Sequence, residues 1–484
     1  MRCLFLVPPA LDGKPAAERI FGCNYGLYSQ ANIFLLYPAT MLRQAGYPTE
    51  YRDYPAAGKG KNEFLRDADS LDHDVVFLST VFLSAATDLL ARDALKARHP
   101  HTRFVFFSTQ PTATPERFLD STSVVIRGEP ETRVLALLEA FLGKRPLASV
   151  PGISFLDGGS PVGTAAPPLL EDLDSLPFPD RSFLRGLDFG NPKLSRSPCT
   201  TMVASRGCGY ACRFCVPNSQ SFAREIEFKR WAEPHGKPPV RLRSAANVVA
   251  ECASLAREGF RAISFLDDQF IWGKERALAI AEGMQPLGLE WSCLARVDRL
   301  QDPEILHAMG RAGCRYIDIG VESFSQAIID DIGKGYRVEQ IGPAVANVKA
   351  AGIEPELNIL LASSPLETEA TIDHTFRELL KLDVDYVLFS ICTPFPFTEF
   401  NAIARAKGWM IRPEYEPIDP MRESFISYPH LKKPRLDRIL RGLNWRFYFR
   451  PSYLWKRFRR LSSWRDFLQK ARIALTLLAW KRSG

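Results

Sequence analysis

The chain has 484 residues, more than one ordinary domain holds, and this length predicts about two to four domains. Hydrophobic residues make up 46% of it and charged residues 24%, which is typical of a globular protein and excludes a disordered or fibrous one. Apart from one group of three, the ten cysteines are scattered, which excludes a disulfide framework. No apolar run approaches the roughly 18 residues of a spanning helix, and the first one is too short for a signal peptide. We therefore expect a cytoplasmic protein.

Residues 1–145 alternate short apolar strands with helical stretches. We expect helices at 35–45 and 85–97, and strands at 2–7, 49–53, 74–79, 103–107 and 123–127. This alternation predicts a doubly wound, Rossmann-like parallel sheet. Such sheets bind ligands at the carboxyl ends of their strands. The loops expected there contain Pro8, Pro9, Ser79, Thr80, Ser108, Thr109, Gly128 and Glu129.

The rest of the chain divides into three parts. Residues 146–195 are rich in Pro and Gly turn clusters and predict a linker. The strand–helix alternation resumes over residues 196–405, and residues 406–484 predict a helical, basic C-terminal region. Six strands are expected in the central part, at 200–205, 262–266, 289–295, 316–320, 356–361 and 386–391.

Three cysteines share one short loop after the first central strand. Cys208, Cys212 and Cys215 have the spacing Cys-x3-Cys-x2-Cys. Three thiolates can hold three irons of a [4Fe-4S] cluster and leave the fourth iron open, whereas a ferredoxin supplies thiolates for all four. The alternatives are a zinc knuckle, which usually needs a second ligand pair elsewhere, and three buried thiols.

The run Cys-Gly-Tyr-Ala-Cys-Arg-Phe-Cys resembles the cluster motif of radical S-adenosylmethionine (SAM) enzymes, in which an aromatic residue such as Phe214 is also typical. The resemblance implies that the open iron binds SAM, and that the reduced cluster cleaves SAM to methionine and a 5′-deoxyadenosyl radical. It also implies a partial (β/α)6 TIM barrel over residues 196–405. A reducing partner such as flavodoxin or ferredoxin follows from the same resemblance.

Further SAM contacts are expected at the ends of the barrel strands, where active groups lie in such folds. We choose Asp268, rather than the aspartate before it, as an acceptor for the SAM ammonium; the alternative is a helix N-cap. Arg296 is a candidate partner for the SAM carboxylate, with a local salt bridge as the alternative. The resemblance places Glu322 and Ser323 near the ribose or the methionyl part.

The strand-end loops of residues 1–145 resemble the cobalamin-binding domain that precedes the barrel in a large radical SAM subgroup. The resemblance implies that the eight loop residues named above contact cobalamin. The Asp-x-His-x-x-Gly motif is absent, so the cobalt would have no histidine ligand. A Ser108-Thr109-Gln110 sequence replaces the usual glycines, which leaves a degenerate domain without a cofactor as the alternative.

The C-terminal region concentrates positive charge. Residues 431–484 hold sixteen Lys or Arg and two Asp, a local charge of +14, so the remainder carries −7 (7 − 14). We expect helices at 436–449 and 455–480, broken at Pro451. A basic helix with tryptophans can lie peripherally on an anionic membrane. The alternatives are a helix that packs on the barrel and covers the active site, and nucleic-acid binding, which we do not expect.

Two enzymatic functions stay open. The first is a cobalamin-dependent methyltransferase that acts on an unactivated carbon of a hydrophobic substrate, lipid-like or tetrapyrrole-like, or of a natural product. The second is a radical SAM enzyme with the same domains that forms rings or carbon–carbon bonds, or rearranges its substrate, without methyl transfer. A non-enzymatic iron–sulfur protein is the third alternative. No catalytic residue is assigned.

Overall fold

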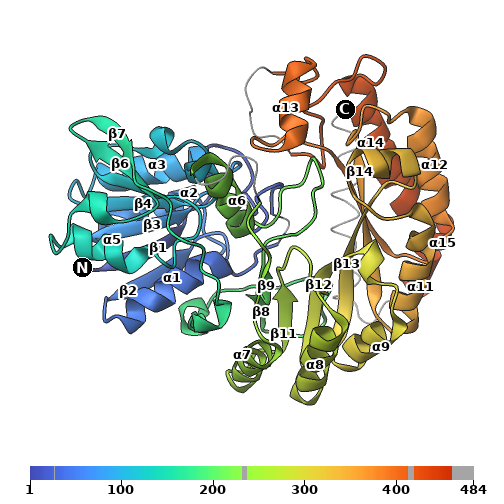
Figure 1. Ribbon diagram of the computed structural model, residues 1–484, viewed down its shortest axis with the longest axis horizontal. Coiled ribbons are helices and arrows are strands. Elements are labelled where there is room, and N and C mark those ends of the chain that lie inside the picture. The colour runs from blue at the N-terminus through green and yellow to red at the C-terminus, as the bar shows by residue number, and fades with distance from the viewer. Residues whose placement is uncertain (27, 232–236, 413–418, 460–484) are drawn as a thin grey trace.

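The computed structural model describes residues 1–26, 28–231, 237–412 and 419–459, with the side chains of residues 456–459 left out. Two α/β units lie side by side, one built on each of two large sheets (Figure 1). The strands expected from the sequence are present in both units, and the predicted fold class is confirmed.

The first sheet has the strand order β2-β1-β3-β4-β5-β6-β7, and its first five strands are parallel. Its strands are apolar because helices cover both faces. In β1, Phe5 belongs to one core and its neighbours Leu4 and Leu6 to another. The parallel strands are β1 (Cys3–Val7), β2 (Thr49–Asp53), β3 (Val75–Ser79), β4 (Arg103–Phe107) and β5 (Ser123–Ile126). The helices are α1 (Ile33–Gln44), α2 (Lys61–Asp67), α3 (Ala85–Lys96), α4 (Thr109–Ala113) and α5 (Val134–Phe141).

The segment expected to be a linker also contributes to this sheet. Strands β6 (Ile153–Asp157) and β7 (Ser160–Gly163) form an antiparallel hairpin that extends the sheet beyond β5. Its turn contains Gly158 and Gly159, both with positive φ. The hairpin is short and flanked by Pro and Gly, so its sequence is typical of a loop.

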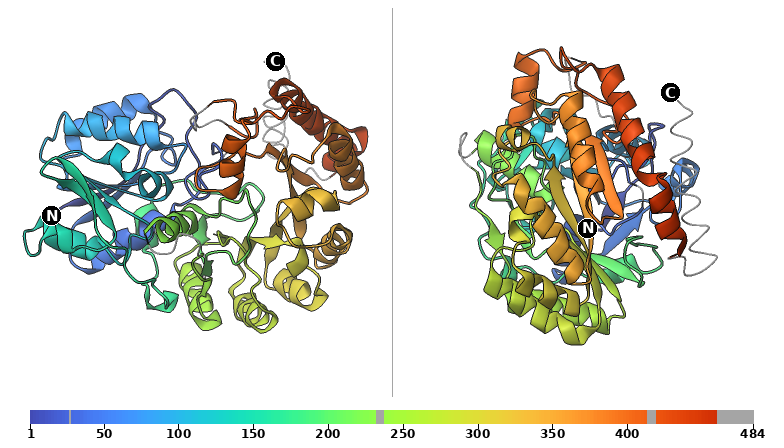
Figure 2. Two further views of the ribbon diagram at one scale, coloured as in Figure 1. Left: turned by 45° about the horizontal axis from the view of Figure 1, so that its top comes forward. Right: turned by 90° about the vertical axis from the view of Figure 1, so that its right-hand side faces the viewer.

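The second sheet is a partial barrel of six parallel strands in sequence order. Helices lie around its outer side (Figure 2). The strands are β8 (Cys199–Met202), β11 (Ala262–Phe265), β12 (Glu290–Arg296), β13 (Cys314–Glu322), β14 (Glu354–Leu361) and β15 (Tyr386–Ile391). The helices are α7 (Ala245–Arg257), α8 (Lys274–Met284), α9 (Pro303–Arg311), α10 (Gln326–Asp331), α11 (Ile341–Ala350), α12 (Glu369–Leu380) and α13 (Glu399–Ala406).

Part of the C-terminal region belongs to the barrel. Helix α14 (Lys433–Tyr448) packs against β15 and places Leu436, Leu440, Leu443 and Phe447 in the barrel core. Helix α15 (Pro451–Arg459) begins at the expected break. Most of the second expected tail helix, residues 460–480, lies outside the described residues. No described helix is both long enough and apolar enough to cross a bilayer.

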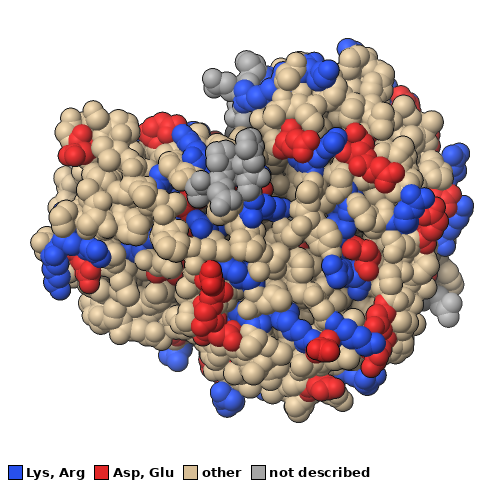
Figure 3. All heavy atoms as spheres, in the orientation of Figure 1, with Lys and Arg blue, Asp and Glu red and all other residues tan. Residues whose placement is uncertain are grey.

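Buried ion pairs join the two units. Helix α6 (Ser219–Trp231) follows the cysteine loop and packs against α4 of the first unit. Across this interface Arg133 pairs with Glu227 at 3.0 Å, and Arg206 pairs with Glu131 at 2.7 Å. These four side chains are at most 2% exposed, so the interface positions the cysteine loop against the first sheet. On the outer surface, by contrast with this buried interface, acidic and basic side chains are exposed and interspersed over the face shown in Figure 3.

Candidate active site

The cysteine loop lies between strand β9 (Ser205–Arg206) and α6. The thiols of Cys208, Cys212 and Cys215 are half-buried and unbridged. Burial raises the pKa of Cys215, and the neighbouring thiols of Cys212 and Cys208 raise it further, as expected for three thiols that face one another. Among the described residues, no group of three or more His, Cys, Asp or Glu is arranged around a single metal ion. Thiolates of a cubic cluster each bind a different iron, so this donor set fits a [4Fe-4S] cluster with one open iron.

Arg296, the last residue of β12, lies at the cysteine loop. Its Nη1 lies 3.9 Å from Cys212 Sγ, and its guanidinium lies 3.5 Å from the centre of the Tyr210 ring. It also donates to Asp298 Oδ1 at 2.9 Å and to the carbonyl of Lys334. The local salt bridge is therefore present, and part of the guanidinium faces the cysteines as well.

Lys334 is a second cation at this loop, and sequence reasoning gave it no role. Its Nζ lies 2.5 Å from Glu322 Oε1, and both side chains are 9% exposed. Burial on its own would lower the pKa of Lys334, but the charges of Glu322 and Cys212 raise it. Glu322 has a φ of 64°, an uncommon value for a residue other than glycine. The signal in the sequence is a lysine between Gly333 and Gly335, whose positive φ values turn the chain sharply there.

Asp268 has a free acceptor close to the loop. Its Oδ1 accepts from the backbone N–H of Asn218 at 2.6 Å, and its Oδ2 is buried without a partner among the described residues. Burial raises its pKa to about 7, against the opposing effects of the Asn218 N–H and of the Ser221 hydroxyl, which lies close by. By contrast, Asp267 accepts from the N–H of Ala204 and the hydroxyl of Ser205, which holds the strand ends together. Asp268 is not a helix cap, because α8 begins only at Lys274.

The other two predicted SAM residues differ in position. Phe214 is half-buried and packs against the barrel core. Ser323 is turned toward α12: its hydroxyl lies 3.2 Å from Thr375 Oγ1 and accepts from the N–H of Ser325. The structure thus brings Asp268, Arg296 and Glu322 toward the cysteine loop, while Ser323 stabilises the loop after β13.

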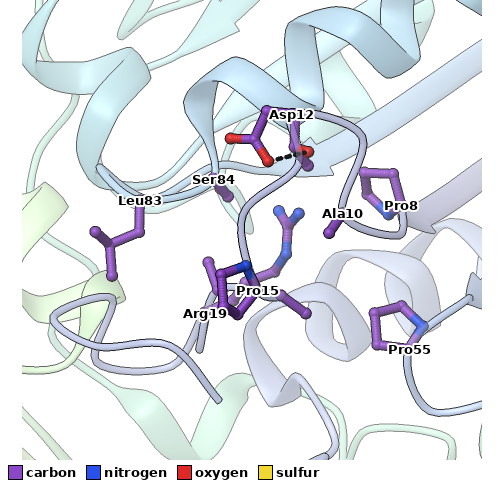
Figure 4. A pocket seen from close by; sticks show the side chains of 11 residues that line it. Pro8, Ala10, Asp12, Pro15, Arg19, Pro55, Leu83 and Ser84 are labelled. Carbon is purple, nitrogen blue, oxygen red and sulfur yellow. Dashed lines mark hydrogen bonds between the residues drawn. The ribbon is translucent and has the colours of Figure 1, made fainter. Parts of the chain in front are cut away.

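The carboxyl ends of the first sheet carry unsatisfied hydroxyls. The side chains of Ser79, Ser108 and Thr109 are buried, and their oxygens have no partner in the described part of the chain. A buried hydroxyl without a hydrogen bond costs free energy, which a polar ligand would recover. The Thr80 hydroxyl, in contrast, donates to Asp88 Oδ2 at 2.7 Å. Pro8 and Pro9 end β1, and Pro8 lines a small pocket (Figure 4).

Gly128 and Glu129, two of the expected cobalamin contacts, lie at the interface between the two units. A Cβ on Gly128 would lie 2.2 Å from Glu227 Oε2, so this glycine allows the close approach of α6. The carboxylate of Glu129 accepts from Arg241 at 2.9 Å and pairs with Arg206 at 3.3 Å. Both residues serve the interface between the units, because their neighbours there are arginines and glutamates of the barrel side.

A cavity of about 190 Å³ lies at the ends of β1 and β2. Its lining includes Val7, Arg19, Asp53 and Tyr28. Burial raises the pKa of Tyr28, and the charges of Glu356 and Asp318, both on barrel strands, raise it further. Tyr28 therefore lies between this cavity and the inner side of the barrel.

The inner side of the barrel is partly open. On β13, β14 and β15 the outward residues are buried under the helices, and alternate residues are only half-buried. This is the period of two expected for a strand with one packed face. The half-buried inward residues include Asp318, Gly320, Asn358, Leu360, Leu388 and Ser390.

Comparisons with known proteins agree with this geometry. Residues 202–379 match the Radical SAM superfamily. An uncharacterised methyltransferase of Pyrococcus horikoshii is 27% identical over 94% of both chains. An anaerobic magnesium-protoporphyrin IX monomethyl ester cyclase of Cereibacter sphaeroides is 27% identical over 65% of this chain and 48% of its own length. The structure of the radical SAM methyltransferase TsrM from Kitasatospora setae, with cobalamin and a [4Fe-4S] cluster bound, has a TM-score of 0.64 at 17% identity, over 90% of this chain and 83% of that one.

Proposed function

Because the chain carries a domain of the radical SAM superfamily, we propose that it is a cobalamin-dependent methyltransferase that acts on an unactivated carbon of a hydrophobic substrate. One observation carries the proposal. The strand ends of the first sheet hold unsatisfied hydroxyls, and the helix after the cysteine loop is docked beside them. A cofactor bound at those strand ends would face the cluster.

The residues of the barrel have distinct parts in this proposal. Cys208, Cys212 and Cys215 would hold the cluster, which together with SAM supplies the radical chemistry needed to remove hydrogen from an unactivated carbon. The free Oδ2 of Asp268 is available to the SAM ammonium. Arg296 keeps a positive charge beside Cys212 for an anionic partner such as the SAM carboxylate.

The first unit fits cobalamin in part. Ser79, Ser108 and Thr109 are the residues with free hydrogen-bonding capacity, and Pro8 and Pro9 shape the neighbouring strand end. Gly128 and Glu129 would act indirectly, through the docking of α6. When bound, the corrinoid would supply the methyl group that replaces hydrogen on the substrate carbon.

The second candidate function is ring formation without methyl transfer. The cyclase of Cereibacter sphaeroides favours it, since that relative matches this chain as closely in identity as the methyltransferase does. The methyltransferase spans both units of this chain with equal coverage of its own length, which is why we prefer methyl transfer.

The test uses SAM that carries a trideuterated methyl group. The full-length protein is reconstituted anaerobically with cluster and hydroxocobalamin, reduced, and incubated with a panel of hydroxylated polycyclic lipids and tetrapyrroles. We expect one product whose mass reports a trideuteromethyl group in place of hydrogen. The Cys215→Ala variant should make none, and Cys252→Ala, which removes a buried thiol far along the chain on α7, should retain the activity. A product without deuterium would overturn methyl transfer in favour of the second function.

A further inference from the structure

Two polar side chains face each other inside the barrel. Asn358 on β14 donates its Nδ2–H to Asp318 Oδ1 on β13 at 2.6 Å. Both side chains are half-buried and belong to the inward set of their strands. Asn358 Oδ1 is buried and has no hydrogen-bond partner in the described part of the chain. The pair therefore has more hydrogen-bond acceptors than donors. A buried acceptor without a donor costs free energy, and a ligand that brings a donor would remove that cost.

The charged groups nearby do not meet this need. Lys193 donates to Glu356 and to the hydroxyl of Tyr316, deeper in the barrel. Glu322, on the other side of Asp318 along β13, is paired with Lys334. The charged groups that act on Asp318 are thus one cation, Lys193, which already has a carboxylate partner, and the further carboxylate Glu322. The phenol of Tyr28 and the thiol of Cys293 are also close enough for the charge of Asp318 to raise their pKa values.

Apolar side chains lie beside this pair on the two flanking strands, β12 and β15. In the sheet register, Asp318 lies beside Leu294 of β12, and Asn358 lies beside Leu388 of β15. Both leucines are half-buried on the inner side, as is Leu360. A ligand that fits this surface has an apolar body and one polar group that reaches Asp318 and Asn358.

We propose that Asp318 and Asn358 select a substrate whose apolar body carries a hydrogen-bond donor, either a hydroxyl or an ammonium group. This inference rests on the proposed function, in which the inner side of the barrel holds the substrate. A carboxylate at the same position would face oxygen acceptors and the negative charges of the barrel, so it is excluded. A site built to bond a donor rejects analogues that lack one, because its own polar groups then stay unpaired.

The test compares three probes with one apolar body: 1-adamantanol, 1-adamantylammonium and adamantane-1-carboxylate. Their dissociation constants are measured by calorimetry on the full-length, cluster-reconstituted protein. The alcohol or the ammonium should bind at least about tenfold more tightly than the carboxylate, as expected when one buried hydrogen bond is made or lost. Asn358→Leu should weaken the binding of the preferred probe, and Asp330→Asn, on the exposed side of α10, should not.

The nearly isosteric Asp318→Asn variant distinguishes the two donors. It should weaken the ammonium probe strongly and the alcohol little, because an amide oxygen still accepts a hydrogen bond but carries no charge. Preferred binding of the carboxylate, equal binding in all variants, or no binding by any probe would overturn the inference. These outcomes leave the proposed function separately testable, since SAM cleavage and corrinoid retention need no substrate.

Discussion

Lys334 and Glu322 place one positive and one negative charge beside the cysteine loop, and both are almost fully buried. A buried pair adds little to stability as a whole, but a buried charge that loses its partner is costly. Removing either side chain of the pair should therefore destabilise the protein more than removing both. Lys334 is also a cation close to the cysteine loop, because the charge of Cys212 raises its pKa.

We predict that Lys334→Met lowers the free energy of unfolding by about 3 kcal/mol, because it leaves the Glu322 carboxylate buried and unpaired. The double variant Lys334→Met/Glu322→Leu should recover a large part of that loss. The matched control is Lys381→Met, whose pair with Glu378 is exposed. Urea denaturation of the cluster-free protein measures all three. If the buried and the exposed variants lose the same free energy, the pair is not buried as described.

At the scale of residues, the sequence alone predicts those residues whose spacing limits which cofactor they can bind. The three cysteines needed no structure, because their separation in one loop limits what they can bind. Asp268 was chosen over its neighbour, and its position with a free oxygen supports that choice. Lys334 and Asp318 could not be found, because their partners, Glu322 and Asn358, are defined by strand register and loop geometry.

At the scale of elements, α6 and the segment 127–133 form the joint between the two units. Arginines of the barrel side hold Glu129 and Glu131, and Arg133 reaches back to Glu227 of α6. Since α6 follows the cysteine loop directly, this joint sets where the cluster loop lies relative to the first sheet. The sequence suggested a ligand role for Glu129, because a strand-end glutamate has the same pattern whether it meets a cofactor or an arginine.

We predict a pH-dependent contribution of Glu129 to stability. Burial on its own would raise the pKa of Glu129, but the guanidinium groups of Arg206 and Arg241 lower it from 4.5 to about 2. A carboxyl group whose pKa is lower in the folded state stabilises the fold above its unfolded pKa. That contribution is lost as the pH falls from about 4.5 toward 2.

The measurement compares wild type with Glu129→Gln at several pH values. The difference in free energy of unfolding should be largest above pH 5 and should shrink toward about pH 3. Glu139→Gln, at a half-exposed position, is the control and should show a small difference throughout. A difference for Glu129→Gln that stays constant down to pH 3 would contradict the ion-pair assignment.

The strands of the first sheet were predictable because helices cover both faces and leave continuous apolar runs in the sequence. The barrel strands were predictable because residues of their packed face recur at every second position. The hairpin of β6 and β7 was not, because it lies at the sheet edge, where four residues of β7 need no apolar run. Helix α14 was expected as a helix, but its packing on β15 follows from side chains spaced along one face and from the open edge that β15 presents.

At the scale of the whole molecule, the carboxyl ends of the two sheets face a common region. Tyr28 lies in the loop after β1, and the charges of Asp318 on β13 and Glu356 on β14 raise its pKa. Helix α4, which follows β4, packs on α6. In the proposed function, a cofactor on the first sheet and a cluster on the second act on one substrate. The tail after α15, residues 460–484, lies outside the part of the chain that the structure describes.

We predict that residues 460–484 promote binding to anionic membranes. They contain six Lys or Arg and one Asp, a net +5 (6 − 1), and each basic residue near an anionic surface contributes about 1 kcal/mol. Co-sedimentation compares the full chain with a version that ends at Arg459, which keeps α14 and its core leucines. The full chain should bind anionic vesicles more strongly, and added salt should weaken the binding. Equal binding by both versions would refute a membrane role for the tail.

The most direct test of cobalamin dependence is the corrinoid content of the reconstituted protein. The full chain is incubated anaerobically with hydroxocobalamin, desalted, and analysed for bound corrinoid by its absorbance. We predict about one corrinoid per chain, held at the strand ends of the first sheet by a site that a large ligand fills. A protein that retains its [4Fe-4S] cluster and cleaves SAM, yet keeps no corrinoid, would contradict the account and leave the ring-forming function in its place.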